Sequence, residues 1–160
     1  MTSLFQQFLE DASGERARVQ TAANLLSRDE TILESTELGI TRWYLHRHLD
    51  RPSTTSLYFH ELELPPRAHG PRIRCQGGIV HFVVAGSGYA VVDGRRHDWE
   101  ALDVIGIPPK EFGVTYQLFN DSEDEARVLV VWPNLDSALG PDGGVEFEVM
   151  EPASTYTGDQ

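Results

Sequence analysis

The sequence predicts an all-β fold, a sandwich or barrel of short strands preceded by two short helices. Beyond about residue 38, apolar and polar side chains alternate with the period of two that is typical of half-buried strands. Turn signals rich in Gly, Pro and Asp divide this region into eight or more segments of strand length. The chain has 160 residues, of which 40% are hydrophobic, and this is enough for one domain with its own core.

Two helices are expected before the strands. Residues 3–10 and 15–26 each place apolar side chains at helical spacing, and Ser13 and Gly14 lie between them as a break. The first apolar face consists of Leu4, Phe5, Phe8 and Leu9, and the second of Val19, Ala22, Ala23 and Leu26. We expect residues 1–37 to form a helical segment that packs on the barrel.

The strands follow from alternation and from the turns that end them. Pro65-Pro66 and Pro108-Pro109 each end a strand, because proline has no donor for a ladder, and Asp93-Gly94 indicates a tight hairpin. Strands are expected at residues 41–46, 56–64, 71–75, 78–84, 87–92, 103–107, 113–119, 126–133 and 145–149. Residues 38–150 are therefore the predicted β domain, and the polar residues 151–160 a flexible tail.

Charge and cysteine content narrow the partners and the compartment. The net charge of −12 argues against nucleic acid and anionic membrane, which both attract clustered positive charge. No window has 18 apolar residues, and the N-terminus lacks the basic region and apolar run of a signal peptide. Cys75 is the only cysteine, so no internal disulfide can form. A cytoplasmic soluble protein is the prediction.

Two motifs give the β domain a more specific interpretation. Residues 77–100, GGIVHFVVAGSGYAVVDGRRHDWE, and the following residues 102–109 resemble the cupin family, as do Gly113 and Asn120 in a second motif over residues 111–120. The similarity covers residues 55–133 and is strongest to small single-domain bacterial cupins, some related to gentisate-type ring-cleaving dioxygenases. The resemblance implies a cupin barrel, the double-stranded β-helix or jelly roll, and a homodimer.

The metal-ligand positions of that family fall on unusual residues in this chain. When the first motif is anchored on Gly86, its two His and its Glu fall on Ile73, Cys75 and Ile79, and the His of the second motif falls on Tyr116. Family members hold a divalent metal such as iron there. Isoleucine cannot ligate a metal, and cysteine and tyrosine would ligate only when ionised. We therefore expect no metal cofactor; a site with non-standard ligands that recruits another histidine is the alternative.

Strand alternation also predicts what the barrel interior contains. The inward residues are expected to be Ile73, Cys75, Ile79, His81, Tyr116 and Leu118, with Tyr58 and His60 nearby. If the register slipped by one residue, Arg72 and Arg74 would turn inward and bind an anion. Phe112 is expected to narrow the entrance. The result is a mostly apolar pocket with a few polar groups, as is usual for a small-molecule site.

Three interior residues are candidates for catalysis. His81 would act as a general acid and base, or is a core histidine bonded to Tyr116 or to a backbone carbonyl. Tyr116 would donate a hydrogen bond to a carbonyl or oxyanion, or fills the volume of an absent metal. Cys75 would be a nucleophile paired with His81, or a small apolar filler. The predicted ligand-binding residues are Tyr58, His60, Ile73, Ile79, Leu118 and Phe112.

These predictions support three hypotheses of different classes. The first is a metal-independent isomerase, lyase or cyclase that acts on a small apolar or aromatic carbonyl compound. The second is a non-catalytic protein that binds a small molecule in the barrel. The third is a metal-dependent, dioxygenase-like cupin with non-standard ligands. The sequence identifies neither the substrate nor the reaction.

Overall fold

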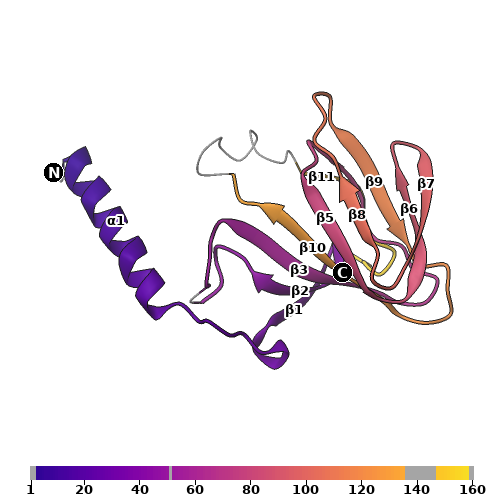
Figure 1. Ribbon diagram of the computed structural model, residues 1–160, viewed down its shortest axis with the longest axis horizontal. Coiled ribbons are helices and arrows are strands. Elements are labelled where there is room, and N and C mark those ends of the chain that lie inside the picture. Colours follow the sequence, from indigo (N-terminus) through magenta and orange to yellow (C-terminus); the bar gives the residue numbers. More distant parts are fainter. Residues whose placement is uncertain (1–2, 51, 136–146, 159–160) are drawn as a thin grey trace.

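Two antiparallel sheets and one N-terminal helix make up the computed structural model, which describes residues 3–50, 52–135 and 147–158 (Figure 1). The larger sheet, sheet A, contains in spatial order β1 (Ile32–Thr36), β2 (Gly39–Leu45), β3 (Leu57–Leu64), β10 (Ala126–Pro133), β5 (Ile79–Ala85) and β8 (Val104–Ile107). The smaller, sheet B, contains β11 (Glu148–Glu151), β4 (Arg72–Cys75), β9 (Val114–Phe119), β6 (Ser87–Val92) and β7 (Arg95–Glu100).

The two sheets face each other without forming the closed barrel that was expected. Strands β8 and β1 are the edges of sheet A, and β7 and β11 are the edges of sheet B. No ladder joins an edge of one sheet to an edge of the other within the described residues. The mostly β architecture is confirmed, and the architecture is a sandwich with open sides.

Two strands were missed by the sequence analysis. Strand β1 is almost entirely exposed, and in β7 only Trp99 is buried, so neither strand shows the alternation of a half-buried strand. Strand β7 is instead fixed by the Asp93-Gly94 turn, which pairs Val92 with Arg95. The hairpin turn therefore determines the position of β7, although the sequence of β7 alone is typical of an exposed segment.

One helix replaces the two that were predicted. Helix α1 (Leu4–Thr21) runs through Gly14 without a break, and a short 3₁₀ turn η1 (Arg28–Glu30) follows. A glycine inside a helix costs only about 1 kcal/mol. That cost is opposed by a capping box between Ser3 and Gln6 at the helix start and by an ion pair of 2.6 Å between Arg18 and Glu15.

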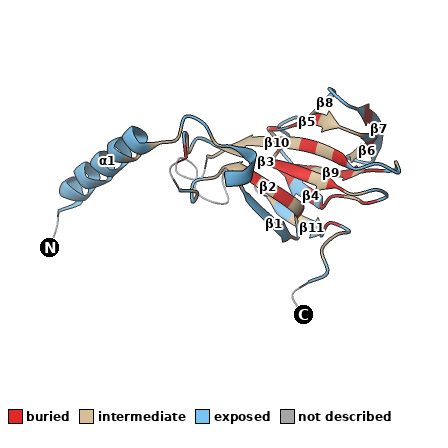
Figure 2. Cartoon of the chain, turned by 90° about the horizontal axis from the view of Figure 1, so that it is seen from below, coloured by how far each residue is buried: buried red, intermediate tan, exposed pale blue. Residues whose placement is uncertain are grey.

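The helix does not pack on the sheets as expected. None of its residues is buried, and it extends away from the sandwich (Figures 1 and 2). The sequence-based prediction was that the apolar side of the helical segment packs on the β domain of the same chain. Within the described residues, no helical segment could cross a lipid bilayer.

The C-terminal segment is held against the domain and is not a flexible tail over residues 151–156. Ala153 is buried, and its N–H donates to the carbonyl of Glu37 at 2.9 Å. The N–H of Ser154 donates to the carbonyl of His69 at 3.0 Å. Two backbone bonds and one buried methyl group thus fix a segment whose polar composition predicted disorder.

The core lies between the inner faces of the two sheets (Figure 2). Burial alternates along β4, where Ile73 and Cys75 are buried while Arg72 and Arg74 are exposed. The alternative register, with the arginines inward, is therefore wrong. The inward set Ile73, Cys75, Ile79, His81, Tyr116 and Leu118 is buried as predicted.

Candidate functional site

The imidazole of His81 meets the phenol ring of Tyr116 across the interior. His81 lies on β5 of sheet A and Tyr116 on β9 of sheet B, so each sheet supplies one ring. The ring centroids are 5.1 Å apart with an interplanar angle of 70°, an edge-to-face contact. The two side chains are 1% and 3% exposed, so this contact is shielded from bulk water.

A second buried histidine belongs to the same row of side chains. Across sheet A, His60 on β3 is the register partner of Val130 on β10, and Val130 is the partner of His81 on β5. Side chains of register partners lie on the same face of a sheet. Both imidazoles therefore project inward, one strand apart.

Burial keeps both imidazoles neutral at neutral pH. Burial, with a smaller contribution from the nearby His81, lowers the pKa of His60 to about 3. It lowers the pKa of His81 to about 4, although a hydrogen bond with the backbone of Ile105 opposes the shift. Nδ1 of each ring has no hydrogen-bond partner within the described residues. Such unpaired buried nitrogens are unusual and leave two positions able to bind a polar atom.

Burial likewise keeps the neighbouring phenol of Tyr116 and thiol of Cys75 neutral, which for these groups is the protonated form. Burial raises the pKa of Tyr116 well above its usual value, and the neighbouring Cys75 raises it further. Burial raises the pKa of Cys75 as well, although the backbone of Gly77 opposes that shift. The phenol is therefore a hydrogen-bond donor, and the thiol is not the thiolate that a nucleophile requires.

A small cavity connects the two histidines and the tyrosine. It is lined by Leu38, His60, Leu62, Gly70, Pro71, Ile73, His81, Tyr116, Leu118, Val130 and Phe147. Its free volume is about 20 Å³ for the centre of a water-sized sphere. One water needs about 10–15 Å³ by this measure, so the cavity has room for a water and not for an organic molecule.

Two indole rings pack against the imidazole of His60, one from each neighbouring strand. Trp43 lies 4.7 Å and Trp132 5.3 Å from its imidazole, measured between ring centroids. Phe147 stacks on Trp132 at 5.6 Å. The indole N–H of Trp43 donates to Glu34 at 2.6 Å, which fixes the orientation of that ring.

The structure brings together five of the residues named from the sequence. His60, Ile73, His81, Tyr116 and Leu118 all line the cavity. Sequence reasoning missed Trp43, Trp132 and Val130, which pack around the histidines. Alternation along the strands could have shown that these side chains point inward. Which residues they contact depends on the order of the strands in the sheet, which alternation does not give.

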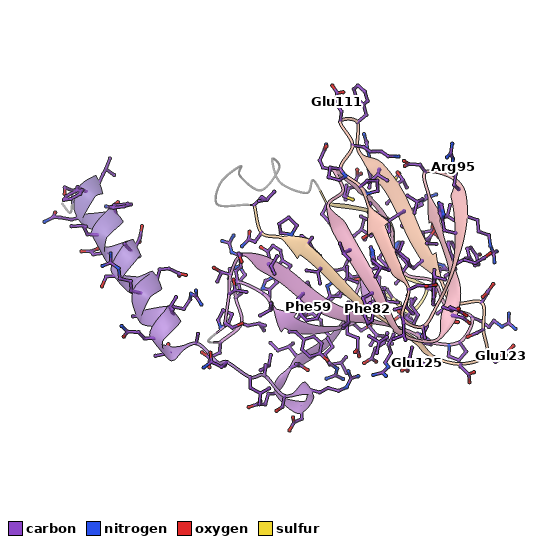
Figure 3. The ribbon with its side chains drawn as sticks, viewed as in Figure 1. Phe59, Phe82, Arg95, Glu111, Glu123 and Glu125 are labelled. Atoms are coloured by element: carbon purple, nitrogen blue, oxygen red, sulfur yellow. The ribbon has the colours of Figure 1, made fainter. Side chains whose placement is uncertain are left out.

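Four other predicted residues lie outside this cavity. Cys75 and Ile79 are buried in the core but do not line it, and Tyr58 is half-buried against His46 and Trp132. Phe112 was expected to narrow the entrance, and this is wrong, because its side chain is 83% exposed. Its neighbour Glu111 marks the tip of the loop between β8 and β9 (Figure 3).

Comparison with known proteins identifies the architecture. No protein-family model matches the chain, and no curated protein matches it. Solved structures do match, among them a cupin 2 conserved barrel domain protein from Salinispora arenicola, with a TM-score of 0.51 and 16% identity over 70% of this chain and 87% of that one. The chain has the cupin fold.

Two further solved structures match with similar scores. The polyketide cyclase RemF from Streptomyces resistomycificus matches with a TM-score of 0.55 and 20% identity, over 69% of this chain and 79% of that one. The plu4264 protein from Photorhabdus luminescens matches with a TM-score of 0.55 and 13% identity, over 73% of this chain and 91% of that one. At these identities the likeness concerns the fold alone.

The four positions at which the sequence resemblance places metal ligands do not offer a donor set for a metal ion. Ile73 and Ile79 offer no donor atom, and burial disfavours the ionised forms of Cys75 and Tyr116. Within the described residues, no group of three His, Cys, Asp or Glu side chains is placed to hold an ion. These residues do not fit a cupin metal.

Proposed function

We propose that the interior of this cupin fold binds a small apolar or aromatic carbonyl compound and that the protein is a metal-independent isomerase, lyase or cyclase. The observation that supports this proposal is the contact between His81 and Tyr116 at the wall of a mostly apolar cavity. A proton acceptor and a proton donor then face one guest in a site of low dielectric constant, where each interaction is strengthened.

The two residues would have complementary roles. Tyr116 stays protonated, so it can donate a hydrogen bond to a carbonyl oxygen and stabilise the oxyanion that forms. His81 stays neutral, so an unprotonated ring nitrogen can remove a proton from the carbon next to that carbonyl and return it elsewhere. Proton transfer of this kind is common to isomerases, lyases and cyclases of carbonyl compounds.

Ligand entry requires side chains to move. A carbonyl compound is larger than the present cavity, and half-buried Leu38 and Phe147 are the lining residues that can yield without opening the core. Of the three reactions, cyclisation has one further support. The structural match RemF is described as a polyketide cyclase.

A non-catalytic binding protein is the second candidate, and the low pKa of His81 favours it. A general base is most effective when its pKa lies near the working pH, and a pKa of about 4 makes a weak base at pH 7. A dioxygenase-like cupin with non-standard ligands has no supporting donor set in the described residues.

Acetophenone, a minimal aromatic ketone, tests the proposal. Its methyl protons exchange with D₂O when a base removes them, and NMR follows both this exchange and the carbonyl carbon shift. We expect the protein to accelerate exchange and His81→Gln to lower the rate roughly 100-fold or more while acetophenone still binds. Tyr116→Phe should remove the downfield carbonyl shift, and EDTA should change neither signal.

Matched controls separate the outcomes. His97→Gln makes the same chemical change at an exposed histidine and should leave exchange unchanged. Binding without any exchange would establish the non-catalytic candidate, and the loss of exchange in EDTA would revive a metal. The absence of both binding and exchange would overturn the proposal of a carbonyl site.

A further inference from the structure

Helix α1 exposes an apolar stripe that nothing in the described chain covers. Leu4, Phe5, Phe8 and Leu9 lie on successive turns at helical spacing, and Phe5 and Phe8 are 68% and 64% exposed. An isolated 18-residue helix is marginal in water, because most helical stability in proteins comes from packing an amphipathic face. The stripe therefore requires a partner.

The outer face of sheet A has an uncovered apolar half. Phe82 on β5 pairs with Val104 on β8 and with Leu129 on β10, and Val80 pairs with Val131 in the next row. We call these five residues the outer patch. Phe82 is 37% and Val104 63% exposed. Figure 3 labels Phe82 together with Phe59, whose strand β3 borders the patch.

Beside the outer patch, part of this face on β2 and β3 is ionic and already occupied. Arg28 of η1 pairs with Glu61 at 2.6 Å and with Glu63 at 3.1 Å, and Arg42 lies 3.7 Å from Glu63. The chain that leaves helix α1 is thereby attached over β2 and β3, and the outer patch on β10, β5 and β8 stays open. An exposed apolar patch bordered by charged residues is typical of an interaction surface.

The stripe and the outer patch match in size. Three neighbouring strands about 4.8 Å apart make a surface roughly 10 Å wide, which is close to the diameter of a helix. From Leu4 to Leu9 the stripe rises about 8 Å along the helix at 1.5 Å per residue, and Val80 and Phe82 lie about 7 Å apart along β5. The stripe and the outer patch can therefore cover one another.

The helix does not reach the patch of its own chain in this structure. A hydrogen bond of 2.6 Å from Arg18 to the carbonyl of Pro52 holds the C-terminal end of the helix. From there the helix extends away from the sandwich (Figure 1). Two copies that exchange helices would form the same contact twice under twofold symmetry. We propose that helix α1 packs its apolar stripe on the outer patch of a second copy of this chain, and that this exchange forms the homodimer.

The first experiment measures mass in solution by light scattering after size exclusion. We expect the wild-type chain to be a dimer. The variant with Phe5→Asp and Phe8→Asp and the single variant Phe82→Asp should each raise the dimer dissociation constant about 100-fold or more. Met150→Asp places the same charge on an exposed apolar residue of sheet B and should leave the dimer intact. Circular dichroism confirms that each variant folds.

The second experiment shows which chains touch. Leu9→Cys and Val80→Cys are prepared as separate variants, mixed, and treated with a short bifunctional maleimide. A crosslinked product of dimer mass in the mixture, absent from either variant alone, is expected. A monomeric wild type, or a dimer indifferent to the Phe5 and Phe8 changes, would overturn the proposal. So would a doubly substituted chain that crosslinks only within itself. The interior cavity is not involved, so this test is independent of the carbonyl proposal.

Discussion

The imidazole of His60 and the indole of Trp43 are register partners on neighbouring strands, with ring centroids 4.7 Å apart. Trp132 covers a second side of the imidazole at 5.3 Å. An ionised imidazole in this enclosure would lose its contact with bulk water, which explains why burial is the largest cause of its lowered pKa. This neutral, enclosed histidine links the fold to pH.

The free energy of unfolding should fall as the pH falls from about 6.5 toward 4. The unfolded chain binds a proton at each histidine near pH 6.5, whereas the folded chain resists until about pH 4 at His81 and about pH 3 at His60. Stability from these groups is therefore complete above pH 6.5. Each histidine accounts for a loss on the order of 3 kcal/mol. Urea unfolding between pH 7.5 and 4 measures this.

The control for that prediction removes one titrating group. His81→Gln keeps a polar side chain of similar size and should make stability less dependent on pH over the same window. The exposed change His97→Gln should not alter the pH dependence. An identical pH dependence in His81→Gln and the wild type would contradict the buried neutral imidazole.

Gly88→Ala should lower the free energy of unfolding far more than the same change at Gly106. A Cβ at this position would lie 2.1 Å from the carbonyl oxygen of Phe119 and 2.6 Å from Trp99, and neither the strand nor the buried ring can give way. We expect a loss of about 3 kcal/mol. Gly106→Ala on edge strand β8 meets nothing within 4 Å and should change stability by less than about 0.5 kcal/mol. Equal melting temperatures for the two variants would be the contrary result.

Asn120→Asp should loosen the acidic turn that follows β9. The amide nitrogen of this buried residue donates to the carbonyls of Leu64, Pro65 and Asp124 at 2.9, 3.0 and 2.7 Å. A carboxylate would repel all three, so we expect a loss of roughly 3 kcal/mol in chemical unfolding. Asn24→Asp makes the same change at an exposed site and should have almost no effect.

Cys75 should resist thiol reagents in the folded protein. Its side chain is 1% exposed and burial raises its pKa, so both access and ionisation are unfavourable. The rate of reaction with Ellman's reagent should be lower than in urea by about 100-fold or more. Fast labelling of the native chain would instead support the nucleophile that the sequence suggested.

Local patterns predicted the strands and the inward side chains, because alternation along a strand does not depend on its neighbours. They did not predict which strands meet. His60 and His81 belong to one row only because β10 lies between β3 and β5, and β10 comes from a distant part of the chain. Phe112 shows the limit of motif position as a guide, since a turn can direct a large ring to solvent.

The helix error has a different physical origin. Ser13 and Gly14 are poor helix residues, yet their cost is small beside that of starting a second helix, so one continuous helix forms. The prediction that the helix packs on the domain was wrong for another reason. Apolar periodicity shows which face of a helix is to be covered, and it does not show which molecule covers that face.

The small size of the cavity also governs how fast any guest can associate. A compartment with space for a single water admits an organic molecule only during transient opening, so the association rate constant should fall well below the diffusion limit. The measured dissociation constant will equal that of the opened form divided by the fraction of molecules that are open, so the measured affinity is weaker. Slow-onset binding curves, independent of stirring or viscosity, are the kinetic signature of such an interior.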